Sequence, residues 1–343
     1  MLLGTQSTDC ELQEPRISVS AASALVVVAG NVNYFYDRIG QRIAEALRDL
    51  RVDAQVATIR DLPPREFDCC FLINLAEIVA GHSDEADALR RLAALRYNCR
   101  FLAVWNFDSM ATRWFSRTCN LLRRVDFDRF VDSNIHQQSH LVPAEFRPRY
   151  DFIGYALTRR ERGQLARFRE LRDAAERPIP WATIGHATDA RVSLAHRLVS
   201  EVDPRGFVYL PPLSPVSQDG PHLNEAQYQA VLRRSRYHVW CAHHNALYLE
   251  GERYRASALT GGVPVKILFQ PVPQDMDLPF ANLLLPFENF TSHLREMDFF
   301  QVRDQFLAEF QSQPTLDSEL SHFFRRVGIR GTFAQGPVNL FTE

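Results

Sequence analysis

One stretch of the chain gathers side chains that are suited to binding an anion. Residues 237–267 read YHVWCAHHNALYLEGERYRASALTGGVPVKI, in which polar residues separate two apolar runs. His244 and Asn245 supply hydrogen-bond donors and acceptors, and Glu252 supplies a carboxylate that accepts hydrogen bonds from hydroxyl groups. Arg253 adds a guanidinium whose planar fork fits a phosphate. These residue types together predict a binding site for an anion.

The two apolar runs of this stretch are typical of buried parallel strands. The first run, YHVWCA, would deliver the polar loop at 243–245 to one edge of a sheet. A helix that begins near Glu252 would direct its free N–H groups to the same place, and Gly261 and Gly262 would turn the chain into the second strand. The order is β-α-β, and ligands of such units bind beyond the carboxyl ends of the strands.

The same residues resemble the donor-site segment of GT-B glycosyltransferases, in which an acidic residue opens a helix that leads to a small-Gly-x-Pro-Val turn. The matching parts are Glu252 and Arg253 at the start of the predicted helix and ALTGGVPV over residues 258–265. The spacing from Glu252 to Pro264 is also similar to the α-1,3-fucosyltransferase pattern. The CgeB-like and exostosin-like glycosyltransferases share this frame. The match is good over the segment and holds only in outline elsewhere.

The resemblance implies an α/β protein of GT-B fold, with two Rossmann-like domains whose parallel sheets face each other across a cleft. It implies a glycosyltransferase with a nucleotide diphosphate sugar as co-substrate and no cofactor or metal, because helix dipoles and basic side chains replace a cation. Glu252, Arg253, Gly261 and Gly262 would bind the donor. Of the two carboxylates that flank Gly251, Glu252 matches the pattern better than Glu250, but either could equally serve only to cap the helix. Arg255 is the second choice for the phosphate. His244 and Asn245 would either hydrogen-bond to its sugar or base or simply pack the loop.

The chain also departs from the related patterns. The commonest retaining GT-B enzymes carry two glutamates eight positions apart, and here Leu249 and Ser257 stand at those positions. Arg253 replaces the lysine of the fucosyltransferase-like pattern, which keeps the charge but exchanges a point charge for a planar fork. The stereochemical outcome of a transfer therefore stays open.

A second glycine loop precedes a helix near the middle of the chain. It reads GHATDAR from Gly185 to Arg191, after the apolar run WATI. Its position is similar to that of the donor-phosphate loop of the resembling family, so Gly185, His186 and Arg191 would also bind the donor. Backbone N–H groups and a guanidinium there could hold a pyrophosphate. The alternative is an ordinary strand-to-helix turn with a solvated arginine.

An inverting transfer needs a general base near the acceptor hydroxyl. The resemblance assigns the acceptor to the first domain, where Asp108 directly follows the predicted strand RFLAVWNFD. His82, Glu77 and Asp37 also follow strands or loops that could reach the cleft. Asp108 and His82 are the predicted catalytic residues. A carboxylate at the position of Asp108 could equally serve only to cap the next helix.

Two strings of residues could be mistaken for metal sites. His243 and His244 are adjacent on a loop, so their side chains point apart, and no third ligand is suitably spaced. Asp126-Phe127-Asp128 has the DxD form of metal-dependent GT-A enzymes, but it lies far in sequence from the arginine-bearing segment. No metal site is predicted.

Composition narrows the class of protein. The chain has 343 residues, 46% of them hydrophobic, which allows two domains with real cores. The net charge of −2 gives no indication of nucleic-acid binding. The six cysteines lack Cys-x-x-Cys spacing, and a reducing cytoplasm is their simplest setting. No leader peptide or long apolar run is visible, which predicts a cytoplasmic protein and leaves contact with a membrane surface open.

Strands alternate with helices in both halves of the chain, which predicts two parallel sheets covered by helices. Pro143, Pro148 and a charged stretch interrupt this rhythm before a new strand begins near Pro180. We expect a flexible tail over residues 1–20 and an acceptor domain over 21–150. A connector over 151–178 leads to a donor domain over 179–315, and a C-terminal helix with tail follows over 316–343.

Other functions compete with glycosyl transfer. A protein of the same architecture could bind a nucleotide or sugar without transferring it, as a sensor or assembly partner, and the absent glutamate pair keeps this alternative open. A dehydrogenase is disfavoured because neither glycine loop reads Gly-x-Gly-x-x-Gly. The sugar, the nucleotide base, the acceptor (a glycan, lipid, protein or small molecule) and the oligomeric state stay undetermined.

Overall fold

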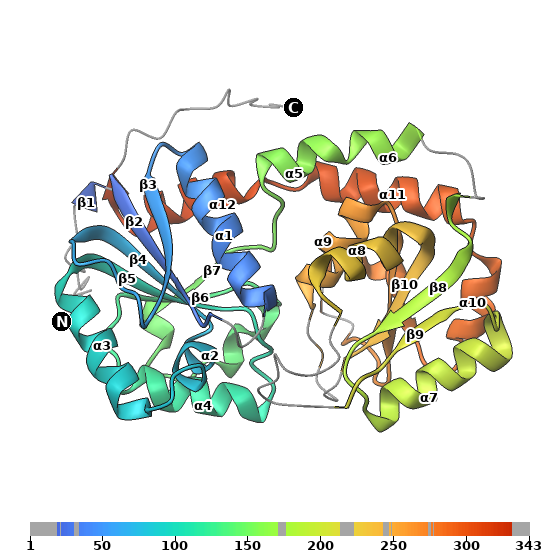
Figure 1. Cartoon of the computed structure of the whole chain (residues 1–343), viewed down its shortest axis with the longest axis horizontal. Helices are drawn as coiled ribbons and strands as arrows, with labels where there is room; N and C mark the ends of the chain where they lie inside the picture. The colour runs from blue at the N-terminus through green and yellow to red at the C-terminus, as the bar shows by residue number, and fades with distance from the viewer. Residues whose placement is uncertain are drawn as a thin grey trace, which may run out of the picture.

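The computed structural model describes residues 19–20, 22–30, 34–170, 176–212, 223–242, 247, 249–273, 276 and 278–330. Two parallel sheets, of six and five strands, organise these residues into two α/β domains (Figure 1). A short strand near each end of the chain, β1 (Val19–Ser20) and β13 (Ile329–Arg330), forms a separate parallel pair. His244 and Asn245 lie outside the described residues.

The sheet of the first domain has the strand order β3-β2-β4-β5-β6-β7, and all its neighbours are parallel. Its strands are β2 (Ser23–Val28), β3 (Asp53–Thr58), β4 (Phe67–Ile73), β5 (Cys99–Asn106), β6 (Arg129–Asp132) and β7 (Tyr150–Phe152). The central strands carry continuous apolar runs such as SALVVV in β2, because helices bury both faces of a parallel sheet.

Helices cover both faces of this sheet. On one face, α1 (Tyr34–Asp49) packs Ile39, Ile43 and Leu47 against the strands, and this four-residue spacing places the three side chains on one side of the helix. On the other face lie α2 (Leu75–Ala80), α3 (Glu85–Tyr97) and α4 (Arg113–Leu122). The carboxylate of Asp84 accepts a hydrogen bond from the N–H of Ala86 at 2.8 Å and so caps α3.

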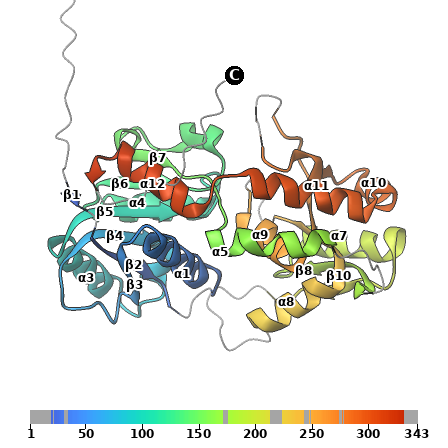
Figure 2. The same ribbon diagram turned by 90° about the horizontal axis from the view of Figure 1, so that it is seen from above.

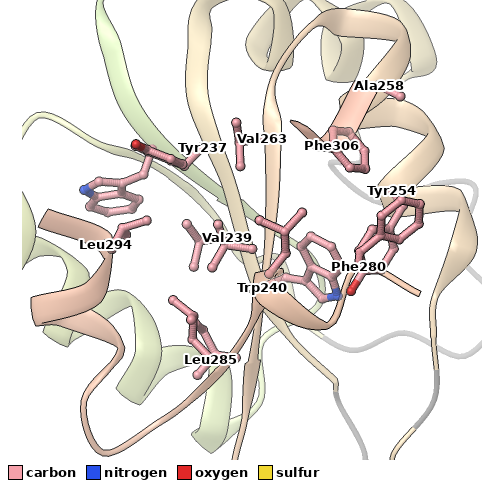
Figure 3. Close-up of a cluster of buried hydrophobic side chains, with 14 of the residues drawn as sticks. Tyr237, Val239, Trp240, Tyr254, Ala258, Val263, Phe280, Leu285, Leu294 and Phe306 are labelled. Carbon is pink, nitrogen blue, oxygen red and sulfur yellow. The ribbon is translucent and has the colours of Figure 1, made fainter. Parts of the chain in front are cut away.

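The sheet of the second domain has the order β12-β11-β10-β8-β9 and is also parallel throughout. Its strands are β8 (Ile179–Ile184), β9 (Phe207–Tyr209), β10 (Ser235–Cys241), β11 (Val263–Leu268) and β12 (Leu284–Pro286). The helices between and after them are α7 (Asp189–Arg197), α8 (Glu225–Arg234), α9 (Gly251–Thr260), α10 (Phe290–Glu296) and α11 (Phe299–Ser312). Aromatic side chains fill much of its core, where Trp240, Tyr254 and Phe280 lie close together (Figure 3).

The chain crosses between the domains twice. After β7 it passes through residues 153–158 to α5 (Arg159–Gln164) and α6 (Ala166–Glu170), and after α11 it returns to α12 (Leu316–Arg326). The two crossings touch, because the N–H of Leu316 donates to the carbonyl of Leu157 at 2.8 Å. The red helix α12 lies among the elements of the first domain in both views (Figures 1 and 2). There Phe323 and Phe324 join the core under α1.

The sequence predicts a GT-B fold of two Rossmann-like domains with facing parallel sheets, and this prediction is confirmed. The return of the last helix to the first domain is a feature that the sequence does not show. The helices α10 and α11 are separate, because Asp298 caps α11 by accepting from the N–H of Gln301 at 3.0 Å. No helix among the described residues is long and apolar enough to span a bilayer.

Candidate functional site

The carboxyl edges of the two sheets face each other. Three contacts between the domains show this. In each of them, both partners lie in a helix or loop that comes after a strand of its own sheet. Phe35 of α1 lies edge-on to Tyr228 of α8, with ring centroids 6.2 Å apart, and Arg38 pairs with Glu225. The side-chain amide of Gln138 donates to the carbonyl of Leu247 at 3.0 Å. Ligands of parallel sheets bind at these edges.

Three of the predicted donor-binding residues converge at the ends of β8 and β10. A Cβ atom on Gly185 would lie 2.8 Å from Nη1 of Arg191 and 3.3 Å from Nη2 of Arg253, so only glycine leaves room for both guanidiniums. Arg191 donates from Nε to the carbonyl of Cys241 at 3.0 Å, and Arg253 donates from Nη1 to the carbonyl of Ile184 at 2.8 Å. The ends of the two strands thus anchor two guanidiniums beside one glycine.

The amides of the same loop have protein partners. Gly185 donates its N–H to the carbonyl of Tyr209 at 3.0 Å, and Ala187 donates to the carbonyl of Pro211 at 2.7 Å. The carbonyl of His186 accepts from Nη1 of Arg191 at 3.1 Å. The predicted cradle of loop N–H groups is therefore replaced at these two positions by backbone pairing, and the positive charge of the site comes from side chains.

Glu250, which the sequence interpretation ranked below Glu252, is the carboxylate at the centre of these cations. Its Oε1 accepts from Nε of Arg253 at 3.2 Å and lies 4.0 Å from Nη2 of Arg191. Its Oε2 accepts from Nζ of Lys266 at 2.9 Å and from the indole of Trp240 at 2.7 Å. Burial alone would raise the pKa of Glu250, but the charges of Lys266, Arg253 and Arg191 outweigh it and hold this pKa far below its usual range.

Glu252 has a different set of partners, and they connect the domains. Its Oε1 accepts from Nη1 of Arg42 on α1 at 2.8 Å and from the hydroxyl of Tyr155, while Oε2 accepts from Arg255 at 3.1 Å. Glu161 of α5 completes the network, because it accepts from Arg42 at 3.1 Å and from Nε of Arg255 at 2.8 Å. In the described structure Glu252 thus belongs to a buried ion network at the interdomain crossing.

Gly261 and Gly262 lie at the opposite edge of the second sheet from Gly185. They follow the last turn of α9 and precede β11, whereas the donor arginines stand beyond the carboxyl ends of β8 and β10. Gly261 has a φ of 70°, and a Cβ there would meet Phe168 at 2.7 Å and Arg177 at 2.8 Å. Gly261 therefore ends α9 and admits these neighbours, and the structure does not bring either glycine to the other predicted donor residues.

Asp108 stands beyond β5 in a group of buried polar side chains. The hydroxyl of Tyr36 donates to its Oδ1 at 2.5 Å, and the amide of Asn74 donates to its Oδ2 at 3.1 Å. Burial raises the pKa of Asp108 to about 6, although the Tyr36 hydrogen bond opposes the shift. Burial, and then the charge of Asp108, raises the pKa of nearby Glu77 to about 7. A carboxylate with such a pKa suits general acid–base chemistry near neutral pH.

His82 is not brought to Asp108. Its Nε2 lies 3.2 Å from a carboxylate oxygen of Asp87, and its Nδ1 contacts the backbone of Asp84. These partners belong to the start of α3, beyond the far end of α2. The contacts of His82 are therefore those of a residue that organises the α2–α3 turn.

Of the two sequence strings that could be mistaken for metal sites, the structure describes only Asp126-Phe127-Asp128. Its two carboxylates pair with other groups of the protein. Asp126 and Asp128 both accept from the guanidinium of Arg96, at 3.1 and 3.2 Å, and Asp128 also accepts from the N–H of Leu102 at 2.7 Å. Within the described residues no three His, Cys, Asp or Glu side chains gather closely enough to hold a metal ion.

A cavity of about 240 Å³ lies between the domains at the crossings. Its walls come from the segment after β6, from β7 and the residues after it, from the start of α9, from residues 278–280 before β12, and from the end of α11 and its connection to α12. Several of these residues are aromatic. The lining residues include Asn134, Phe152, Tyr155, Tyr254, Phe280 and Phe310. Asn134 also donates to the carbonyl of Asp108 at 2.6 Å, so the cavity adjoins the polar group in the first domain.

No family model and no curated protein matches the chain by sequence. Among solved structures it is similar to the glycosyltransferase SnogD from Streptomyces nogalater, with a TM-score of 0.40 and 14% identity over 90% of this chain and 100% of that one. The glycotransferase of kitacinnamycin gives a TM-score of 0.34 and 12% identity over 92% and 97% of the two chains.

A third similar structure is the GtfA/B complex bound to UDP and GlcNAc, with a TM-score of 0.34 and 10% identity over 76% of this chain. The chain spans 56% of the length of that protein. Similarities with such low TM-scores and identities carry no argument about function. The fold assignment therefore rests on the strand order described above, and the functional argument rests on the residues of the site.

Two residues of the arginine cluster escaped sequence reasoning in part or entirely. The sequence pattern favours Glu252 over Glu250, and it does not include Lys266 in the predicted site. One signal was present, because Lys266 is the only lysine of the chain and falls in the middle of an apolar strand. A buried charge requires a partner, which points toward an acidic residue nearby.

Proposed function

We propose that the chain is a glycosyltransferase that moves a sugar from a nucleotide diphosphate sugar to an acceptor held by the first domain. The observation that carries the proposal is the convergence of Arg191 and Arg253 beside Gly185, at the edge of the second sheet that faces the first. A leaving nucleotide diphosphate gains negative charge in the transition state, and fixed cations at that point would stabilise it.

The charge of the cluster supports a diphosphate ligand without a bound metal. Arg191, Arg253 and Lys266 carry three positive charges against the one negative charge of Glu250. The diphosphate of a nucleotide sugar carries two negative charges, which cationic side chains of this kind bind. In this proposal the side chains perform the electrostatic task that a divalent cation performs in other transferases.

Asp108 is the proposed general base. Its pKa of about 6 leaves it mostly ionised at neutral pH and still basic enough to take a proton from an acceptor hydroxyl. Asn74 and Tyr36 fix both of its oxygens, so the carboxylate is held in one orientation. His82, whose partners belong to the α2–α3 turn, has no part in this mechanism.

Two measurements test the proposal and separate it from a binding protein of the same architecture. Calorimetric titration with UDP, GDP, ADP and dTDP should show binding of at least one nucleotide diphosphate. The corresponding nucleotide sugar should then release nucleotide slowly in the absence of acceptor, because water can replace the acceptor hydroxyl. Binding without any release would favour the non-catalytic alternative, and the absence of binding would refute both.

A further inference from the structure

Lys266 holds a buried position that is unusual for this chain. It is the only lysine among 39 lysine and arginine residues, and only 1% of its surface is exposed. It lies on β11 directly opposite Trp240 of β10, so the two side chains stand on the same face of the sheet. Lys266 Nζ and Trp240 Nε1 donate to the same oxygen of Glu250, at 2.9 and 2.7 Å. The sheet thus holds this carboxylate oxygen at two points.

The other carboxylate oxygen of Glu250 faces the donor arginines. It accepts from Nε of Arg253 at 3.2 Å and lies 4.0 Å from Nη2 of Arg191. One side chain therefore spans the distance between the sheet and both guanidiniums. Any displacement of this carboxylate changes the hydrogen bond that orients Arg253.

The backbone of Glu250 supplies an independent observation. Its φ and ψ are 56° and 50°, in the left-handed region that residues other than glycine, asparagine and aspartate rarely occupy. Glu250 precedes α9, yet its side chain makes no capping hydrogen bond to that helix. The unfavourable conformation directs the carboxylate to the cations instead, and strain of this kind is concentrated at functional positions.

We propose that Lys266 and Glu250 form a positioning pair, in which the lysine fixes the glutamate and the glutamate sets the orientation of Arg253 and Arg191 for a diphosphate. The inference rests on the proposed function, because it takes the nucleotide diphosphate as ligand. A lysine suits the buried end of the pair because its ammonium is compact, whereas a guanidinium is a larger planar group. The pair acts by orienting the two arginines, and a cluster of the same net charge without the pair does not orient them.

The variant Glu250→Asp separates orientation from charge. It keeps every charge of the cluster and withdraws the carboxylate by one methylene, and aspartate tolerates left-handed backbone better than glutamate does. We expect the dissociation constant of UDP or GDP, whichever binds the wild-type protein, to rise roughly tenfold or more. The melting temperature should fall, because Lys266 loses part of its buried pairing, so affinity is measured well below the melting temperature of the variant. The matched control is Glu296→Asp, an exposed position on α10.

The double variant Glu250→Gln with Lys266→Met provides a second comparison. It removes the pair and leaves the net charge of the cluster unchanged, so a purely electrostatic role predicts binding like that of the wild type. The positioning role predicts weaker binding and a higher KM for the donor, with the KM for the acceptor unchanged. Isostructural neutral replacement of a buried ion pair is often tolerated by the fold.

Lysine-selective isotope labelling gives a readout that needs no variant, because one lysine yields one side-chain NMR signal. Addition of the binding nucleotide should shift that signal. Wild-type affinity in both Glu250→Asp and the double variant, with an unmoved lysine signal, would overturn the positioning pair while leaving the proposed function intact. A wild-type protein that binds no nucleotide diphosphate would overturn the proposed function and this inference with it.

Discussion

Arg42 and Glu252 lie 210 positions apart in the sequence and form an ion pair of 2.8 Å between the two domains. The pair is part of a buried network in which Arg42 and Arg255 share Glu161, a residue of the segment that crosses between the domains. A buried carboxylate between two guanidiniums is costly to leave without its partners. The network therefore couples the relative placement of the domains to the ionisation of Glu161.

Acid should weaken the protein through Glu161. Burial would raise the pKa of Glu161, but Arg42 and Arg255 prevail and lower it from its usual value of 4.5 to about 2. A lowered folded-state pKa means that the stabilisation is complete above pH 4.5 and is lost as the pH falls toward 2, with a total of roughly 3 kcal/mol. Denaturant unfolding of wild type and Glu161→Gln between pH 7 and 3 measures this. Parallel losses of stability in both proteins would contradict the assignment.

Gly185→Ala tests the packing of the donor arginines. The added methyl group would lie 2.8 Å from Arg191 and 3.3 Å from Arg253, so both guanidiniums must move. We expect a large loss of nucleotide-sugar turnover with a destabilisation of only about 1 kcal/mol, because the clash is with side-chain ends. Gly163→Ala is the matched control, since nothing lies within 4 Å of a Cβ there. Equal turnover in the two variants would show that the arginines are not used.

Arg253→Ala should abolish most of the transferase activity. Its guanidinium is anchored to the carbonyl of Ile184 and to Glu250, and the loss of a charge directed at the leaving group typically slows an enzyme a hundredfold or more, roughly 3 kcal/mol. Steady-state kinetics with saturating acceptor measures the effect. Arg205→Ala, which removes an exposed arginine paired with Asp203, serves as control. Full turnover in the Arg253 variant would refute its assigned role.

The pH profile of the transfer should report Asp108. Its pKa is raised to about 6 by burial, so lowering the pH through 6 protonates the proposed base, and kcat should fall tenfold for each further pH unit. Above pH 7 the rate should level off on this limb. Asp108→Asn should be nearly inactive at every pH while retaining nucleotide affinity. If the dependence of kcat on pH kept its shape in Asp108→Asn, the group that titrates near pH 6 would not be Asp108. The nearby Glu77 would then be the next candidate.

The sheets could be predicted because their determinants are local. Runs such as SALVVV in β2 and the spacing of Ile39, Ile43 and Leu47 in α1 depend only on neighbouring residues, and the strand-loop-helix rhythm places Gly185 and Arg191 correctly at a carboxyl edge. The convergence of Arg191 and Arg253 then follows from the order of the elements.

The rest of the site depends on contacts between distant parts of the chain. The motif that Gly261 and Gly262 share with Glu252 predicts that they bind the donor together. However, α9, of ten residues and about 15 Å, separates the two ends of that motif. The engagement of Glu252 by Arg42 requires the packing of one domain on the other. The role of Lys266 depends on a register between β10 and β11 that no local pattern specifies.

The return of α12 to the first domain has a consequence for biosynthesis. Leu320, Phe323 and Phe324 complete the core that begins with β2, so that core stays open until residues 316–326 have been synthesised. The second domain, in contrast, has all its strands and most of its helices in one continuous segment. During vectorial synthesis the domain that is made first is therefore the one that finishes folding last.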